Sequence, residues 1–371
     1  MNETDAVDHN RALLEDMFRT GAIDVRRGPL FDHVPSQMPS DLPFSRIEGM
    51  LLGLAVGDAL GNTSESQLPT ERMARYGEIR DHLPNNRLSG RRSGLPSDDT
   101  QLAFWTLEQM LADGAFVPQN VARRFCQERI FGIGGSVRAF LSNMKAGVQW
   151  DRAGPKSAGN GALMRIAPML LPHLRTGSTA LWTDTALSAM ITHNDSASIA
   201  ACLAFVGMLW RLMQMTRAPE PEWWLHTYVE SARGLEQNET YRSNAPAFAE
   251  YCGTLWRFVR DAVTRAHDLH WSTLEACNTW YSGAYLFETM PCVIYILMRH
   301  GHDPEEAIIR AVNDTWDNDT IAAIVGAAVG ALHGRRGLPE RWVKGLLGRT
   351  AEADDGQVFP LLERARRAWW H

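Results

Sequence analysis

The chain has 371 residues, of which 45% are hydrophobic and 22% are charged, and its net charge at neutral pH is −6. This is the composition of a globular protein that is long enough to bury a large core without disulfides or structural metals. An acidic balance argues against nucleic acid as a general partner, because binding to phosphates usually needs a basic face.

The cysteines and the N-terminus bear on the compartment. The five cysteines are odd in number and form no Cys-x-x-Cys pair, which excludes a disulfide framework and a zinc site. Residues 1–10 lack the basic-then-apolar order of a secretory signal. The best apolar run, Ile321 to Leu332, is shorter than the roughly 18–20 residues that span a bilayer. We therefore expect a cytoplasmic protein that makes no membrane contact.

Residues 1–45 differ in pattern from the rest of the chain. Residues 4–19 predict one amphipathic helix with an acidic face. Residues 21–44 contain four prolines and no helical period, which predicts an extended segment. Two interpretations of this N-terminal extension remain open: it is a partner-binding arm, or it is a leader that is disordered or packs on its own domain.

From residue 46 onward the pattern is helical almost without interruption. Apolar residues recur at i, i+3, i+4 and i+7 in 47–54, 104–111 and 321–328, whereas alternating strand patterns are almost absent. We predict an all-α fold in which residues 46–371 form one large domain. Its tail, 364–370, is expected to be a terminal helix whose tryptophans pack on that domain. Breaks are expected at 83–96, 132–135 and 218–222.

The first predicted helix of the domain carries Gly53, Gly57 and Gly61 at intervals of four residues. Glycine costs about 1 kcal/mol against alanine in a helix, so three on one face predict a groove into which another backbone packs. Asp58 lies among them on an otherwise apolar helix, and we interpret it as a buried, hydrogen-bonded structural carboxylate. Glu65 follows in a loop.

Two distant segments each bring two carboxylates and a hydroxyl to the start of a predicted helix: Ser97, Asp98 and Asp99 in one, Asp317, Asp319 and Thr320 in the other. Capping a helix needs one such residue rather than three, and adjacent aspartates repel unless a proton or cation intervenes. Six hard oxygen ligands without His or Cys favour Mg²⁺, Mn²⁺ or Ca²⁺ over zinc. If the two helix starts meet in space, they can hold two such ions.

Two further segments offer groups for a phosphate-containing ligand. Gly159, Asn160 and Gly161 precede an apolar stretch that we predict to be helical, and such a turn presents free N–H groups to an anion. The same tripeptide is also a common turn. His193, in a region predicted to be helical, is either a structural residue or a contact to a ribose or phosphate.

Taken in order, these segments resemble the ADP-ribosylglycohydrolase family. The resemblance rests on GLAVGDALG with Glu65, on SDDT, GNGALMRIAP, ITHNDSA and DNDTIAAIVGAAVGA, which spread over residues 47–334. It implies an all-α enzyme with two Mg²⁺ ions in a cleft, Mn²⁺ being the alternative ion. The implied metal ligands are Ser97, Asp98, Asp99, Asp317, Asp319 and Thr320. The implied catalytic acids are Glu65, Asp98, Asp99 and Asp319. The implied substrate contacts are Gly159, Asn160 and Gly161 to the diphosphate, and His193.

The implied reaction removes ADP-ribose from a modified protein side chain, arginine being the favoured acceptor, through an oxocarbenium-like state. The family includes immunity proteins against ADP-ribosylating toxins, and the layout of this chain is similar to theirs. We therefore expect an ADP-ribosyltransferase toxin as a partner bound through residues 1–45. Two alternatives stay open. One is a catalytically weak binding protein that occludes its partner, and the other is a different all-α Mg²⁺ enzyme acting on diphosphates, such as a terpene synthase.

Two positions depart from the family pattern. Ser97 stands where threonine is usual, which keeps the hydroxyl. Thr315 and Trp316 stand where Gly-Gly is usual, and the bulk of Trp316 could narrow the cleft.

Overall fold

The computed structural model describes residues 3–85 and 90–370, and these residues are mostly helical, so the predicted all-α class is confirmed. The helices are α1 (Glu3–Thr20), α2 (Phe44–Gly61), α3 (Pro69–Tyr76), α4 (Asp98–Asp113), α5 (Pro118–Phe125), α6 (Gly135–Lys145), α7 (Trp150–Ala153), α8 (Ala180–Met190), α9 (Ser196–Met213), α10 (Pro221–Ala232), α11 (Leu255–Asp268), α12 (Thr273–Thr279), α13 (Leu286–His300), α14 (Pro304–Asp314), α15 (Asn318–His333), α16 (Glu340–Gly345) and α17 (Val358–Trp369). Two short strands, β1 (Tyr241–Arg242) and β2 (Cys252–Gly253), pair antiparallel.

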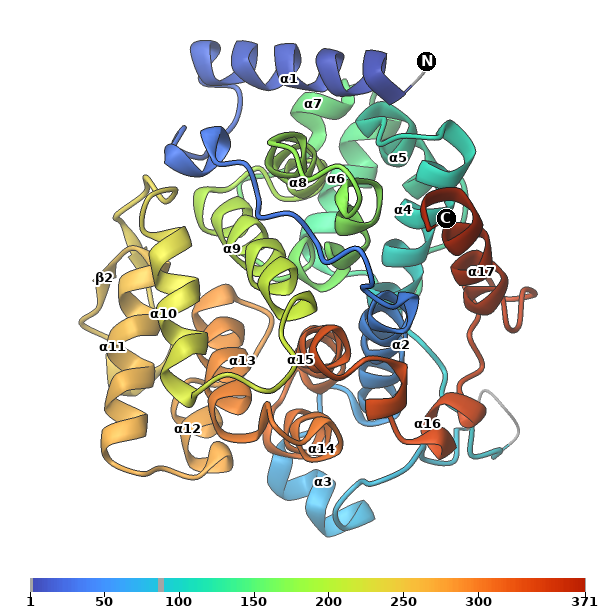
Figure 1. The fold of residues 1–371 in the computed structure, drawn as a ribbon. Coiled ribbons are helices and arrows are strands. Elements are labelled where there is room, and N and C mark those ends of the chain that lie inside the picture. The colour runs from blue at the N-terminus through green and yellow to red at the C-terminus, as the bar shows by residue number, and fades with distance from the viewer. Residues whose placement is uncertain (1–2, 86–89, 371) are drawn as a thin grey trace.

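Helices α2 and α15 lie side by side at the centre of the molecule (Figure 1), because their facing positions lack side chains. A methyl group on Gly53 or on Gly57 would lie 2.1 or 2.0 Å from a carbonyl oxygen of α15. The predicted glycine groove is therefore confirmed, and its occupant is α15. The same crossing places Gly61, at the end of α2, against the backbone of Asp319 at the start of α15.

Helix α9 is apolar and long enough to cross a membrane, by length and composition alone. The sequence interpretation overlooked it when it took residues 321–332 as the best apolar run. Almost the whole helix is buried in the fold, where it packs against α8, α10 and α15. Its apolar composition is therefore that of a core helix.

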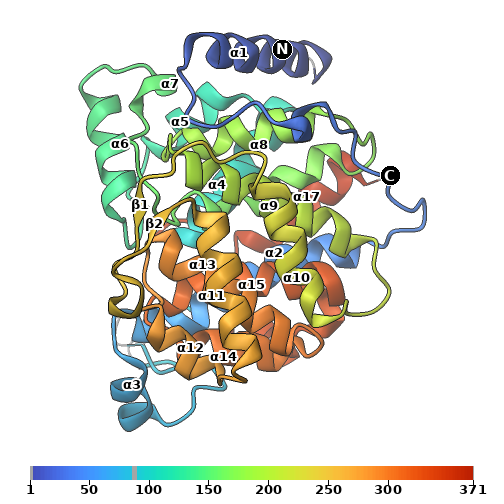
Figure 2. The same cartoon turned by 90° about the vertical axis from the view of Figure 1, so that its left-hand side faces the viewer.

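The N-terminal extension packs on the domain. Helix α1, which confirms the helix predicted over 4–19, lies across one end of the molecule next to α8 (Figures 1 and 2). Its own side chains Leu14 and Met17 are buried against the domain. The buried amide of Asn10 donates to the carbonyl oxygen of Phe116 (2.9 Å) and to Asp184 Oδ1 (2.8 Å). Further along, two tryptophan ring N–H groups of the domain donate to backbone carbonyls of the extension.

The C-terminal helix α17 packs against α4, as expected for the tail. Trp369 and Trp370 are partly buried against the core. The guanidinium of Arg175 lies 3.8 Å from the centre of the Trp370 ring, a distance typical of a cation–π contact.

Candidate active site

A cleft with a cavity volume of about 150 Å³ opens where the starts of α4 and α15 meet. Every predicted site residue except Ser97 lines it. The acids and the hydroxyl are Glu65, Asp98, Asp99, Asp317, Asp319 and Thr320. The remaining predicted residues in the wall are Gly159, Asn160, Gly161 and His193. One cleft thus combines an acidic region with a region of backbone and imidazole groups.

Helix α4 begins at this cleft, and Asp58 of α2 caps its first turn from outside. The Asp58 carboxylate accepts the backbone N–H of Ser97 (2.9 and 3.0 Å) and both the N–H and the hydroxyl of Thr100. The Ser97 hydroxyl makes no cap bond and instead donates to Asp99 Oδ2 (3.0 Å). Because Asp58 satisfies the helix start, Asp98 and Asp99 are left to face the cleft.

The start of α15 supplies the second group of acids. Asp317 holds the N-cap position without making a cap bond, and its Oδ2 accepts the side-chain amide of Asn160 at 2.6 Å. Asp319 follows in the first turn. The hydroxyl of Thr320 donates to Asp99 Oδ2 (3.4 Å). The starts of α4 and α15 are therefore in direct contact.

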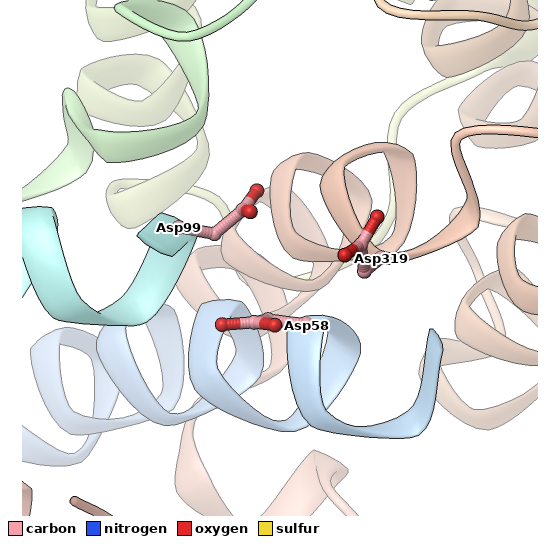
Figure 3. Close-up of side chains that lie close together, drawn as sticks. All are labelled: Asp58, Asp99 and Asp319. Atoms are coloured by element: carbon pink, nitrogen blue, oxygen red, sulfur yellow. The ribbon is translucent and has the colours of Figure 1, made fainter. Parts of the chain in front are cut away.

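Two groups of carboxylates are close enough for each to share a metal ion. Asp58, Asp99 and Asp319 form one group (Figure 3), and Glu65, Asp317 and Asp319 form the other. Within each group the ligand oxygens lie within 4.8 Å of one another. The sequence interpretation placed the ligands at the two helix starts, and the structure adds Asp58 from α2 beside them.

This concentration of buried acids calls for protons or a cation. Burial raises the pKa of Asp98, Asp99 and Asp319 well above the usual range, and neighbouring carboxylates raise it further. Burial also raises the pKa of Asp317 to about 7. Oδ1 of Asp99 is buried and has no hydrogen-bond partner among the described residues. An all-oxygen donor set with such an unpartnered atom fits a hard divalent cation, so the cluster is consistent with metal binding.

The turn at residues 159–161 does not begin an α-helix, and that part of the prediction is wrong. Two 3₁₀ segments follow it, at Leu163–Arg165 and Ala167–His173. Pro168 and Pro172 lie within the second segment, and proline lacks the N–H that a continuing α-helix would use. The helix-start argument for anion binding therefore does not apply here.

Part of the hydrogen-bonding capacity of this turn is used within the protein. The N–H of Asn160 donates to the carbonyl of Ala284 (3.0 Å), and that of Gly159 donates to Ser157 Oγ (3.3 Å). The side-chain amide of Asn160 reaches Asp317 across the cleft. The turn is thus held rigidly to the acidic region, and its glycines line the cleft as backbone.

His193 lies in the turn between α8 and α9 and not in a helix. It is buried at the cleft, with Nδ1 2.9 Å from Thr192 Oγ1. Burial and, secondarily, the positive charge of Arg165 lower the pKa of His193 to about 3, so its imidazole is neutral near pH 7. A methyl group on Gly161 would lie 2.9 Å from His193 Cε1, which explains glycine at that position.

Sequence reasoning missed one wall of the cleft and misjudged one side chain. Residues 132–137 contribute to the wall, and their glycine-rich composition had indicated only a break between helices. Trp316 is not among the residues that line the cleft. Its side chain is 42% exposed and its ring packs against Gly283, so in this structure it does not narrow the cleft.

Comparisons with known proteins identify the family of this chain. The family model described as ADP-ribosylglycohydrolase matches residues 39–368. The ADP-ribosylarginine hydrolase Tri1 of Pseudomonas putida (strain GB-1) is 25% identical, over 81% of this chain and 73% of its own length. The ADP-ribosyl-(dinitrogen reductase) glycohydrolase of Rhodospirillum rubrum is 27% identical, over 86% of this chain and 96% of its own length.

A solved structure shares the fold. It is titled an ADP-ribosylglycohydrolase-related protein complex, superposes with a TM-score of 0.63 and is 26% identical, covering 88% of this chain and 98% of that one. The family model covers most of the chain, including every residue of the cleft. The chain therefore belongs to the ADP-ribosylglycohydrolase family and is a hydrolase of glycosidic bonds.

Proposed function

We propose that this protein is a Mg²⁺-dependent hydrolase that removes ADP-ribose from modified protein side chains, with arginine as the favoured acceptor. The observation that carries the proposal is the direct contact between the starts of α4 and α15. It gathers the acids into one cleft, which they share with the turn at 159–161 and His193.

The acidic region would hold two Mg²⁺ ions, with Mn²⁺ as the alternative, through the predicted ligands that line the cleft and through Asp58, which the structure adds; the predicted ligands are Asp98, Asp99, Asp317, Asp319 and Thr320. Ser97 does not line the cleft, and its hydroxyl supports Asp99 instead. When bound, such ions supply Lewis acidity that orients a water and the ribose hydroxyls. Glu65 would move a proton at the scissile bond, and its exposure and its grouping with Asp317 and Asp319 support this role. Asp98, Asp99 and Asp319 add negative charge that stabilises an oxocarbenium-like state.

The remaining wall would hold the rest of the substrate. The glycines at 159 and 161 allow the diphosphate to approach the backbone closely. The neutral imidazole of His193 can form a hydrogen bond with a ribose or phosphate oxygen, and no charged imidazolium has to be buried to form it. The Pseudomonas putida relative is named as an ADP-ribosylarginine hydrolase, which supports arginine as the acceptor.

The hydrolysis is tested by incubating the protein with arginine-ADP-ribosylated protein and measuring released ADP-ribose. Asp319→Ala should abolish release at any Mg²⁺ concentration while the helical circular dichroism is kept, since Asp319 belongs to both carboxylate groups. The matched control, Asp268→Ala, removes an exposed carboxylate at the end of α11 and should be fully active. Full activity of Asp319→Ala, or of the wild type in excess chelator, would contradict the metal assignment. Parallel assays with Mn²⁺ and Ca²⁺ identify the preferred ion.

We propose separately that the partner is an ADP-ribosyltransferase toxin in the cytoplasm. Residues 1–45 would bind and block this toxin, and the cleft would remove the ADP-ribose that the toxin has attached to its targets. Because the extension packs on the domain, the surface that it offers is the exposed acidic face of α1, including Asp8 and Asp16. The double variant Asp8→Lys and Asp16→Lys should lose binding to the transferase and keep hydrolysis. Undiminished binding would show that α1 is not the contact.

A further inference from the structure

The segment 21–26 of the N-terminal extension contacts the loop that carries His193. The backbone N–H of Asp24 donates to Asn194 Oδ1 (2.9 Å), and Asn194 Nδ2 donates back to the carbonyl oxygen of Ala22 (2.8 Å). The backbone N–H of Asn194 in turn donates to the carbonyl of Pro155 (3.0 Å). One side chain adjacent to His193 is thus paired at both ends of its amide with this segment.

The Asp24 side chain ties the same segment to two more loops. Oδ1 accepts Nε2 of Gln237 (2.7 Å), and Oδ2 lies 3.5 Å from Nζ of Lys156. Lys156 belongs to the loop that leads into the turn at 159–161. The backbone N–H of Arg26 donates to the carbonyl of Leu235 (2.9 Å), and the flanking Ile23 and Val25 are buried. The segment is therefore anchored by side chains on either side of Asp24.

Two of the loops held in this way carry residues that line the cleft, the turn at 159–161 on one and His193 on the other. They are irregular, so their positions depend on contacts made from outside. A Cβ atom on Gly161 would lie 2.9 Å from His193 Cε1, and one on Gly159 would lie 3.2 Å from His193 Nε2, so both glycines leave little space around this imidazole. A displacement of Asn194 would therefore move His193 against the turn, and the turn is bonded through Asn160 to Asp317.

We propose that Asp24 and Asn194 are positioning residues for ADP-ribose binding. The Asp24 carboxylate acts through Lys156 on the turn at 159–161. Asn194, held by the backbone of Ala22 and Asp24, acts on the adjacent His193. The inference rests on the proposed function, which places the substrate diphosphate and ribose on that wall. Asp24 lies before residue 39, where the match to the family model starts. The N-terminal extension would thus raise the affinity of the cleft for ADP-ribose through residues that do not line the cleft, in addition to covering the core.

If the Asp24 carboxylate served only the stability of the fold, its removal would lower the unfolding midpoint and leave ligand affinity unchanged. The Lys156 side chain is 81% exposed, so its ion pair with Asp24 adds little to global stability. Removing the Asp24 carboxylate should therefore leave the unfolding midpoint almost unchanged, because the backbone bonds of residues 22, 24 and 26 persist. The effect should appear locally, in the mobility of the loops and in ligand affinity.

The test uses two variants of the full-length chain. Asp24→Ala removes the contacts to Gln237 and Lys156, and Asn194→Ala removes the two bonds to the backbone of Ala22 and Asp24. Calorimetry with ADP-ribose in Mg²⁺ should show a dissociation constant raised about five- to tenfold in each variant, as expected for loss of one or two positioned hydrogen bonds. Hydrogen exchange followed by mass spectrometry should be faster in peptides covering 155–162 and 191–197. The matched control is Asp32→Ala, which removes an exposed acid of the same extension paired with Arg27 and should match the wild type in both measurements.

Unchanged affinity and unchanged exchange in both variants would overturn the positioning role. A fall in affinity accompanied by an equal loss in Asp32→Ala would also overturn it, since the effect would then be general to the extension. If the wild type itself does not bind ADP-ribose, the proposed function fails instead, and the exchange data still report whether Asp24 holds the loops.

Discussion

Replacing Gly57 with alanine tests whether the close approach of α2 and α15 assembles the acids. The added methyl carbon would lie 2.0 Å from the carbonyl oxygen of Ala322, and contacts below 3.0 Å essentially do not occur. The two backbones must therefore separate by about 1 Å. Overpacking costs about 1–3 kcal/mol, and a collision with rigid backbone belongs at the upper end. The gain of helix propensity is only about 1 kcal/mol, so we expect a net loss of about 2 kcal/mol of unfolding free energy.

The control for this variant is Gly207→Ala in the middle of α9. Its methyl group would lie 3.6 Å from the ring of Trp182, an ordinary contact, so this variant should gain up to about 1 kcal/mol. Both are compared by urea unfolding followed by circular dichroism, and by the Mg²⁺ concentration needed for half-maximal hydrolysis. Gly57→Ala should need more Mg²⁺, because Asp58 and Asp319 move apart. If Gly57→Ala is as stable as the wild type and has the same Mg²⁺ requirement, the reasoning is refuted.

Two further predictions concern the substrate wall and the core. Gly161→Val should raise the dissociation constant for ADP-ribose at least tenfold, on the order of 1.4 kcal/mol, because its Cβ meets His193 at 2.9 Å; an unchanged constant in calorimetry on the folded variant would contradict this. Glu236 is buried, and burial raises its pKa to about 8, so the folded state holds a proton that the unfolded state loses near its usual pKa. Unfolding free energy should therefore fall as pH rises from about 5 to 8. In Glu236→Gln this contribution to the pH dependence of the unfolding free energy should vanish. The free energies are measured by urea unfolding at pH 5, 6.5 and 8, and an equal pH dependence in variant and wild type would contradict the prediction.

The sequence predicted the helical class and the glycine groove because both depend on local spacing. Apolar residues at helical intervals and glycines four apart report directly on which face is buried. That Asp99 and Asp319 lie together depends on how α4 and α15 cross, and their sequence separation carries no such information. The resemblance to the family supplied that expectation, and the contact from Thr320 to Asp99 bears on it directly.

Where sequence reasoning failed, a local signal or a tertiary contact was responsible. Pro168 and Pro172 lie in the stretch after Gly161 that was expected to be an α-helix. Proline disfavours a helix interior, so the sequence alone could have predicted this interruption. The capping role of Asp58 could not be read, because its partners lie some forty residues away at Ser97 and Thr100. The placement of the N-terminal extension also depended on tertiary contacts, such as the amide of Asn10 with Asp184.

The position of Asp58 explains how several aspartates remain available in one buried cleft. A helix start carries unpaired N–H groups and a partial positive charge, and at α4 a single carboxylate from α2 takes those groups. Asp98 and Asp99 are then not needed as caps, and a cation in the cleft is what would allow them to stay ionised. The contact of Gly53, Gly57 and Gly61 with α15 brings Asp319 beside Asp58 (Figure 3), and Asp58 in turn bonds the start of α4. The proposed metal site therefore depends on a helix contact made without side chains, and Gly57 belongs to the assembly of the acidic cluster although it does not line the cleft.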